Sequence, residues 1–182
     1  MPKRIFVLHG WEGTPSSNWF PWLKLKLEER GIKVEVPQLP NAESPKQRDW
    51  LLALDKLVGV ADEETYFIGH SLGCITIMRY LEGLKEGEEI GGAVFVAGFT
   101  DDLGIEEISD FFTTSIDWNK INLHCKTFVA IASDNDQYVS LKYSDILKEK
   151  LNAKVFIQPK MGHFNIPELH VALNELLKMI NA

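Results

Sequence analysis

Short runs of apolar residues alternate along the chain with longer stretches in which apolar and polar positions follow a helical period. The runs are rich in β-branched and aromatic residues and are nearly continuous, which is typical of strands buried on both faces of a parallel sheet. We therefore predict six parallel strands. They cover Arg4–Leu8, Lys33–Val36, Thr65–Ile68, Ala93–Ala97, Thr127–Ala132 and Lys154–Ile157.

Helices are expected between these strands, because apolar residues recur there every three or four positions and would share one helical face. This alternation of strand and helix is typical of α/β folds. The groups that carry the helical period are Trp19, Leu23 and Leu27; Leu51, Leu54 and Val58; Cys74, Ile77, Met78 and Leu81; Ile146, Leu147 and Leu151; and Leu169, Leu173, Leu176 and Ile180.

The stretch 98–126 has no clear strand character and mixes acidic with aromatic residues. We expect a small lid-like excursion at about 98–126 over one end of the sheet, within a single domain of residues 1–182. Its acidic residues are Asp101, Asp102, Glu106, Glu107 and Asp110, and its aromatic residues are Phe99, Phe111, Phe112 and Trp118.

Composition and charge narrow the function classes. The chain has 182 residues, of which 45% are hydrophobic and 25% charged, enough for one sizeable core. A net charge of −7 argues against nucleic acid or an anionic membrane as partner. The two cysteines, Cys74 and Cys125, form no disulfide framework or metal-ligand pattern, and no apolar segment has the length of a signal-peptide core or a membrane span. We expect a cytoplasmic protein.

The sequence Gly69-His70-Ser71-Leu72-Gly73 carries the main chemical signal. It is a G-x-S-x-G motif directly after a predicted strand and directly before a predicted helix, which is the context of a nucleophile elbow. A serine there occupies a strained turn, and the flanking positions must be small so that strand and helix can approach each other. Ser71 is therefore the candidate nucleophile.

A serine nucleophile needs a base and an acid that orients the base. His163 lies in a Gly-His turn after the last predicted strand and is the candidate base. Asp134 and Asp136 both follow the fifth strand, and Asp101 or Asp102 is a third placement for the acid. Strand alternation does not separate Asp134 from Asp136, but Asp136 lies deeper in the turn, which favours it over Asp134.

The whole chain resembles the small serine hydrolase family that includes retinoblastoma-binding protein nine and the bacterial YdeN proteins, a compact form of the α/β-hydrolase fold. The residues that carry the resemblance are His9-Gly10, the Asn18–Leu23 run, Gly69–Gly73, Asp136 with Val139, and Gly162-His163-Phe164. Gln137 departs from it, because many relatives have proline there.

The resemblance implies Ser71 as nucleophile, Asp136 as acid and His163 as base, with backbone amides of Trp11 and Leu72 as the oxyanion hole. With the strand and helix pattern it implies a three-layer α/β/α sandwich with a parallel sheet in the order 2-1-3-4-5-6. Side chains expected to contact substrate are those of Trp11, Trp19, Phe99, Phe111, Phe112 and Tyr138. We interpret His70, His124 and His170 as structural, and Trp22 as a core residue.

The sequence thus predicts a carboxylesterase-like serine hydrolase that cleaves an acyl ester or amide of a small to medium substrate and needs no cofactor or metal. A protein-interaction module on the same fold is the alternative, although such a module has no need of all three catalytic groups. Haloalkane or epoxide chemistry is disfavoured, because those reactions usually use an aspartate at the elbow, where this chain has Ser71.

Overall fold

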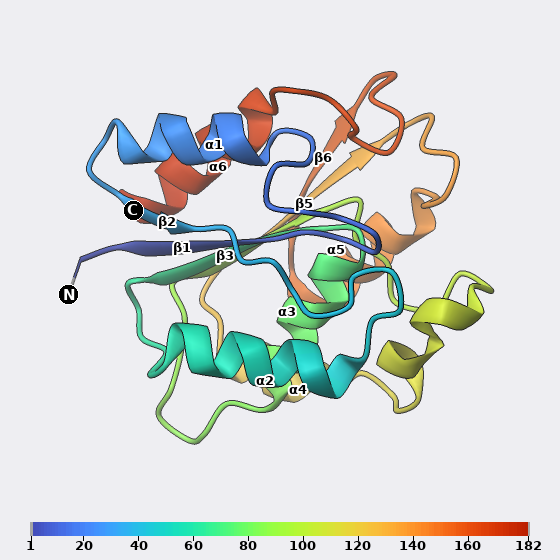
Figure 1. Cartoon of the computed structure of the whole chain (residues 1–182), viewed down its shortest axis with the longest axis horizontal. Helices are drawn as coiled ribbons and strands as arrows, with labels where there is room; N and C mark the ends of the chain where they lie inside the picture. The colour runs from blue at the N-terminus through green and yellow to red at the C-terminus, as the bar shows by residue number, and fades with distance from the viewer. Residues whose placement is uncertain (1, 182) are drawn as a thin grey trace.

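The structure, a computed structural model, describes residues 2–181 and contains a six-stranded sheet (Figure 1). Every neighbouring pair of strands is parallel, and the order is β2-β1-β3-β4-β5-β6, as predicted. All six predicted strands are confirmed to within two residues at each end. They are β1 (Arg4–Leu8), β2 (Lys33–Glu35), β3 (Thr65–His70), β4 (Gly92–Val96), β5 (Phe128–Ser133) and β6 (Lys154–Gln158).

Helices cover both faces of the sheet, which gives three layers. Helices α1 (Phe20–Glu28) and α6 (His170–Ile180) lie on one face, and α2 (Gln47–Val58), α3 (Leu72–Glu82), α4 (Trp118–Leu123) and α5 (Lys142–Leu151) lie on the other (Figure 1). No helix among residues 2–181 is long and apolar enough to cross a membrane.

Alternation along the strands divides the core into two clusters, one on each face of the sheet. In β1, Phe6 and Leu8 pack toward α2 and α3, whereas Ile5 and Val7 pack toward α1 and α6. The same division holds in β3, β4 and β5. Because both faces of these strands are covered, their sequences read as continuous apolar runs.

Two short helical elements in the stretch 98–126 were not predicted from the sequence. They are the 3₁₀ helix η1 (Glu106–Phe112) and α4. The buried guanidinium of Arg79 on α3 holds this region by donating hydrogen bonds to the carbonyl oxygens of Phe111, at 3.0 Å, and Thr114, at 2.6 Å. These elements depend on contacts with α3, so the hydrophobic pattern of the stretch 98–126 itself does not predict them.

The carboxyl ends of the parallel strands all reach one edge of the sheet, where ligands bind in open α/β folds. The loop after β1 carries Trp11, the turn after β3 carries Ser71, and the loop after β4 carries Phe99. Asp136 follows β5 and His163 follows β6. Five segments that are distant in sequence therefore converge on this edge.

Candidate active site

Ser71 lies at a sharp turn between β3 and α3, with φ of 55° and ψ of −121°. A positive φ is strained for a residue with a side chain, and such strain recurs at functional positions. The flanking glycines allow the turn: a Cβ atom at Gly69 would lie 2.6 Å from the carbonyl carbon of Gly73, and one at Gly73 would lie 2.5 Å from the carbonyl oxygen of Leu8. The strand-turn-helix context expected for the motif is present.

His163 and Asp136 are joined by a hydrogen bond of 2.8 Å between Nδ1 of the imidazole and Oδ2 of the carboxylate. The Asp136 side chain is 1% exposed and that of His163 is 12% exposed. The other carboxylate oxygen, Oδ1, accepts hydrogen bonds from the backbone amides of Tyr138 and Val139. Burial favours the neutral acid, but the bonds from His163 and the two amides outweigh it, so the pKa of Asp136 lies below its usual value.

The other candidate acids lie elsewhere. Asp134 is exposed, and its Oδ1 accepts a hydrogen bond from the backbone amide of Lys160, at 2.7 Å. Asp101 accepts one from the hydroxyl of Tyr143, at 2.6 Å, and Asp102 from the amide of Gly104. Of these four aspartates, the structure brings Asp136 to His163.

His70 precedes Ser71 and is buried beside His163, with part of its ring at the cavity. Burial, and then the proximity of His163, lower the pKa of His70 to about 3, so the ring is neutral at physiological pH. Its Nε2 lies 2.8 Å from the backbone carbonyl oxygen of His163, and Nε2 is therefore the protonated nitrogen. The structural interpretation of His70 agrees with this contact, which links the strand that carries Ser71 to the loop that carries His163.

Two backbone amides next to Ser71 have no hydrogen-bond acceptor within residues 2–181: those of Trp11 and Leu72. Leu72 is the first residue of α3, where helical amides have no partner inside the helix. The loop of Trp11 passes close to Ser71, since a Cβ atom at Gly10 would lie 2.9 Å from that of Ser71. Both amides are therefore free to donate to a ligand at the serine.

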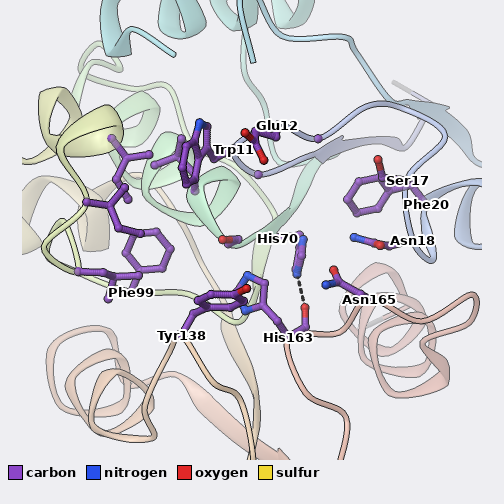
Figure 2. A pocket seen from close by; sticks show the side chains of 17 residues that line it. Trp11, Glu12, Ser17, Asn18, Phe20, His70, Phe99, Tyr138, His163 and Asn165 are labelled. Carbon is purple, nitrogen blue, oxygen red and sulfur yellow. Dashed lines mark hydrogen bonds between the residues drawn. The ribbon is translucent and has the colours of Figure 1, made fainter. Parts of the chain in front are cut away.

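A cavity of about 350 Å³ opens at this edge, lined in part by Ser71 and His163. Figure 2 shows Trp11 and Phe99 to one side of the two histidines and Asn18 and Asn165 to the other. Three of the residues predicted to contact substrate line the cavity: Trp11, Phe99 and Tyr138.

The other three predicted contacts do not line it. Trp19 and Phe111 have no exposed surface, and each belongs to one of the two core clusters. Phe112 packs on the core and against the ring of Phe99. These three side chains pack on the core and do not line the cavity. Neither the helical spacing of Trp19 nor the position of the two phenylalanines in the stretch 98–126 shows whether a side chain meets the core or a cavity.

Besides Gly10, Gly13, Phe20 and His70, sequence reasoning assigned no site role to seven residues of the cavity wall. Leu103, Ile105 and Ile108 come from the stretch 98–126, which was expected to cover the site, although these three were not singled out. Glu12, Ser17, Asn18 and Asn165 are polar loop residues. Asn18 begins the run that carries the family resemblance, but nothing in the sequence separates the other three from ordinary solvent-exposed loop positions.

Comparison with known proteins identifies the family. The family model described as "Serine hydrolase" matches residues 5–182. The chain belongs to this serine hydrolase family. It is thus a hydrolase, and the resemblance stated from its motifs is confirmed.

Two relatives show how far the likeness extends. The YdeN protein of Bacillus subtilis (strain 168) is 35% identical over 165 residues, which cover 90% of this chain and 87% of that protein. Serine hydrolase RBBP9 of Rattus norvegicus is 27% identical over 186 residues, covering 100% and 95% of the two chains.

Solved structures agree with the observed fold. The crystal structure of the ydeN gene product from B. subtilis has a TM-score of 0.94 at 31% identity, covering 99% of this chain and 100% of that one. Est1E from Butyrivibrio proteoclasticus, in a structure with ferulic acid bound, has a TM-score of 0.79 at 16% identity, with 99% and 90% covered. The latter likeness concerns the fold alone, and together they support an α/β-hydrolase fold for this chain.

Proposed function

We propose that this protein hydrolyses carboxylic esters of small to medium acyl groups, with Ser71 as nucleophile, His163 as general base and Asp136 as the acid that orients His163. The observation that carries the proposal is the 2.8 Å hydrogen bond between His163 and Asp136 at a cavity that Ser71 also lines. A carboxylate on Nδ1 holds the imidazole in the tautomer whose Nε2 accepts a proton.

In the first half-reaction the Ser71 oxygen attacks the acyl carbon while Nε2 of His163 takes the hydroxyl proton. The negative charge on the former carbonyl oxygen is stabilised by the amides of Trp11 and Leu72, each of which would contribute about 3 to 4 kcal/mol. The carbon–oxygen bond to the alcohol then breaks, and His163 gives its proton to the departing alcohol oxygen. The products of this step are the free alcohol and an acyl ester on Ser71.

In the second half-reaction water takes the place of the alcohol. His163 removes a proton from the water as its oxygen attacks the acyl carbon, and the bond to Ser71 breaks. The proton returns to the Ser71 oxygen and the carboxylic acid leaves. The enzyme regains its starting state without a redox step or an added group.

The cavity supports the proposed acyl size. At about 350 Å³ it lies at the lower end of the usual range for small-molecule sites. Phe99, Leu103 and Ile105 form an apolar wall in which a short hydrocarbon chain would be removed from water. In this proposal, the stretch 98–126 covers the acyl group.

We retain a reducing, cytoplasmic location as part of the proposal. Cys74 and Cys125 are both free and buried. Burial raises the pKa of both thiols, which keeps them protonated and unreactive. Free thiols in this state are compatible with a compartment in which disulfides do not form.

A fluorophosphonate probe tests the nucleophile. Intact-mass analysis should show one adduct on the wild type, none on Ser71→Ala, and one on the control Ser140→Ala, which changes an exposed serine outside the cavity. Turnover of p-nitrophenyl butyrate should fall by about 10³-fold or more in Ser71→Ala alone. An adduct that persists in Ser71→Ala would exclude Ser71, and wild-type turnover at background would favour the interaction-module alternative.

A further inference from the structure

The two sides of the cavity differ in chemistry. Phe99, Leu103 and Ile105 form the apolar side. Ser17, Asn18, His70 and Asn165 form what we call the polar side, which the ring of Phe20 also borders. Figure 2 shows Asn18 and Asn165 beyond His70 as seen from Phe99. An ester has two halves that must be held on either side of the reacting carbonyl, so each side of the cavity can select one half.

The polar side has hydrogen-bonding groups that make no bond within the protein. The side-chain amides of Asn18 and Asn165 make no hydrogen bond with another residue among 2–181. Asn18 is half-buried and Asn165 is exposed, so both amides are accessible to a ligand. Each amide presents a carbonyl oxygen that accepts and an NH₂ group that donates. A hydroxyl group both donates and accepts, which makes it complementary to such amides.

His70 adds an acceptor in a fixed position. Its Nε2–H donates to the carbonyl oxygen of His163, so the neutral ring carries its lone pair on Nδ1. His70 lines the cavity, and its Nδ1 has no partner within the described part of the chain. A ligand hydroxyl on this side could donate to it.

The charge around the polar side favours a neutral ligand. None of the described residues that line the cavity is a lysine or arginine. The exposed carboxylate of Glu12 borders the cavity, and the chain as a whole carries a net charge of −7. A phosphate or carboxylate on the leaving group would meet negative charge with no cation to pair with it.

We infer that the polar side binds the alcohol half of the substrate, and that the preferred substrates are esters of a neutral, hydroxyl-bearing alcohol with an apolar acyl group on the opposite side. This inference rests on the proposed function. It adds Asn18 and Asn165 as residues that select the leaving group.

A pair of esters with the same acyl group tests the inference. Propyl hexanoate and 1-hexanoylglycerol share the acyl chain and the three-carbon alcohol skeleton and differ by two hydroxyl groups. The wild type should favour 1-hexanoylglycerol in kcat/KM. Asn165→Leu, which replaces the amide with an apolar group of similar size, should lower this preference by about fivefold to tenfold, the usual value of one hydrogen bond.

The half-reactions locate the effect. Both esters give the same hexanoyl-enzyme, so a residue that binds the alcohol acts on acylation and not on deacylation. Rapid-mixing measurements should place the loss in Asn165→Leu in the acylation rate constant for 1-hexanoylglycerol. Asn18→Gly is the second variant, because the backbone of Asn18 has φ of 52°, which glycine adopts without strain. Asn174→Leu, on the exposed side of α6 and outside the cavity, is the matched control.

The outcomes separate the two proposals. Turnover of both esters without preference, or an unchanged preference in both asparagine variants, would overturn the inference and leave the proposed function standing. An altered deacylation rate in the variants would also overturn it, because it would place these residues on the acyl side. Turnover of neither ester together with no fluorophosphonate adduct would overturn the proposed function itself.

Discussion

Nε2 of His70 donates a hydrogen bond of 2.8 Å to the backbone carbonyl oxygen of His163, and the centroids of the two imidazole rings lie 4.9 Å apart. His70 is fixed at the end of β3 and packs against the rings of Trp19 and Phe20. His163 belongs to the loop after β6, so its position relative to Ser71 depends on contacts that cross between segments. His70 is such a contact, and we regard it as a positioning residue for the proposed base.

Removal of the hydrogen bond from His70 should lower activity, because His163 would no longer be held in its position relative to Ser71. In His70→Leu the carbonyl oxygen of His163 loses its partner, and a displacement of about 1 Å of a catalytic group can cost about 10²-fold in rate. We expect kcat for p-nitrophenyl butyrate to fall by about 10-fold to 10²-fold. In His70→Gln the side-chain amide can donate in place of Nε2 and should restore most of the rate.

Melting temperature and the rate of fluorophosphonate labelling provide the controls for this pair. Equal loss of labelling in both His70 variants, when both are folded at the assay temperature, would show that the donor has no positioning role. Loss of melting temperature with unchanged kcat in His70→Leu would assign His70 to stability alone.

Acid should destabilise the protein partly through the same residue. The pKa of His70 is about 3 in the folded state and 6.5 for an ordinary histidine, so the unfolded chain binds a proton at this site as the pH falls through 6.5 and the folded chain does not. The stability contributed by neutral His70 is therefore complete above pH 6.5 and is lost as the pH falls toward 3, by roughly 1.4 kcal/mol per pH unit inside that window.

Urea unfolding at pH 7, 6, 5 and 4 measures this effect, with His70→Gln as the reference that does not titrate. Asp136 also loses stabilisation on acidification, because its folded pKa is lowered, but it is present in both proteins and cancels in the comparison. The stability of the wild type relative to His70→Gln should therefore decrease from pH 6 to pH 4. Parallel curves would mean that His70 titrates normally.

The sequence was sufficient for the sheet because β1, β3, β4 and β5 are covered on both faces, which leaves a continuous apolar run for each strand. It was insufficient for η1 and α4, which are short. Bonds from Arg79 to the carbonyl oxygens of Phe111 and Thr114 hold the end of η1 and the turn after it, and α4 packs against α3. Backbone acceptors of this kind leave no pattern in the residues that supply them.

The candidate site also contains residues that the sequence identifies and residues that it does not. Ser71 and His163 stand in motifs that depend on neighbouring residues and strand ends, so the sequence identifies them. Asn18 and Asn165 are 147 positions apart and meet at one cavity through the fold. Asn165 stands in no recognisable motif, and the Asn18–Leu23 run carries the family resemblance without indicating that Asn18 lines a cavity. Trp19 shows the opposite error, because a large aromatic residue near a loop looks like a ligand contact until its complete burial is known.

The two aspartates after β5 should differ sharply on substitution. In Asp136→Asn the amide NH₂ can replace the oxygen that accepts from Nδ1 of His163, which favours the tautomer protonated on Nε2 and unable to accept the Ser71 proton. Loss of this carboxylate lowers kcat by about 10⁴-fold in serine proteases, and we expect a fall of that order. Asp134→Asn retains an oxygen that can accept from the amide of Lys160 and should keep kcat within about threefold.

Ester kinetics on both variants under identical conditions, with melting temperatures as the folding control, measure the difference. A larger loss in Asp134→Asn would transfer the acid role to the residue that sequence reasoning ranked second.

Phe111 and Ile105 both belong to the stretch 98–126, but their substitution by alanine should affect different properties, stability for Phe111 and acyl-chain preference for Ile105. Phe111 is fully buried and does not line the cavity, so Phe111→Ala should cost about 3 to 5 kcal/mol of stability and leave acyl-chain preference unchanged. Ile105 is half-buried and lines the cavity, so Ile105→Ala should cost about 1 kcal/mol and enlarge the apolar side. The preference for p-nitrophenyl octanoate over the butyrate should then rise by about fourfold for each methylene that the new space removes from water. If Phe111→Ala changes chain-length preference while Ile105→Ala lowers only the melting temperature, Phe111 forms the acyl wall and Ile105 belongs to the core.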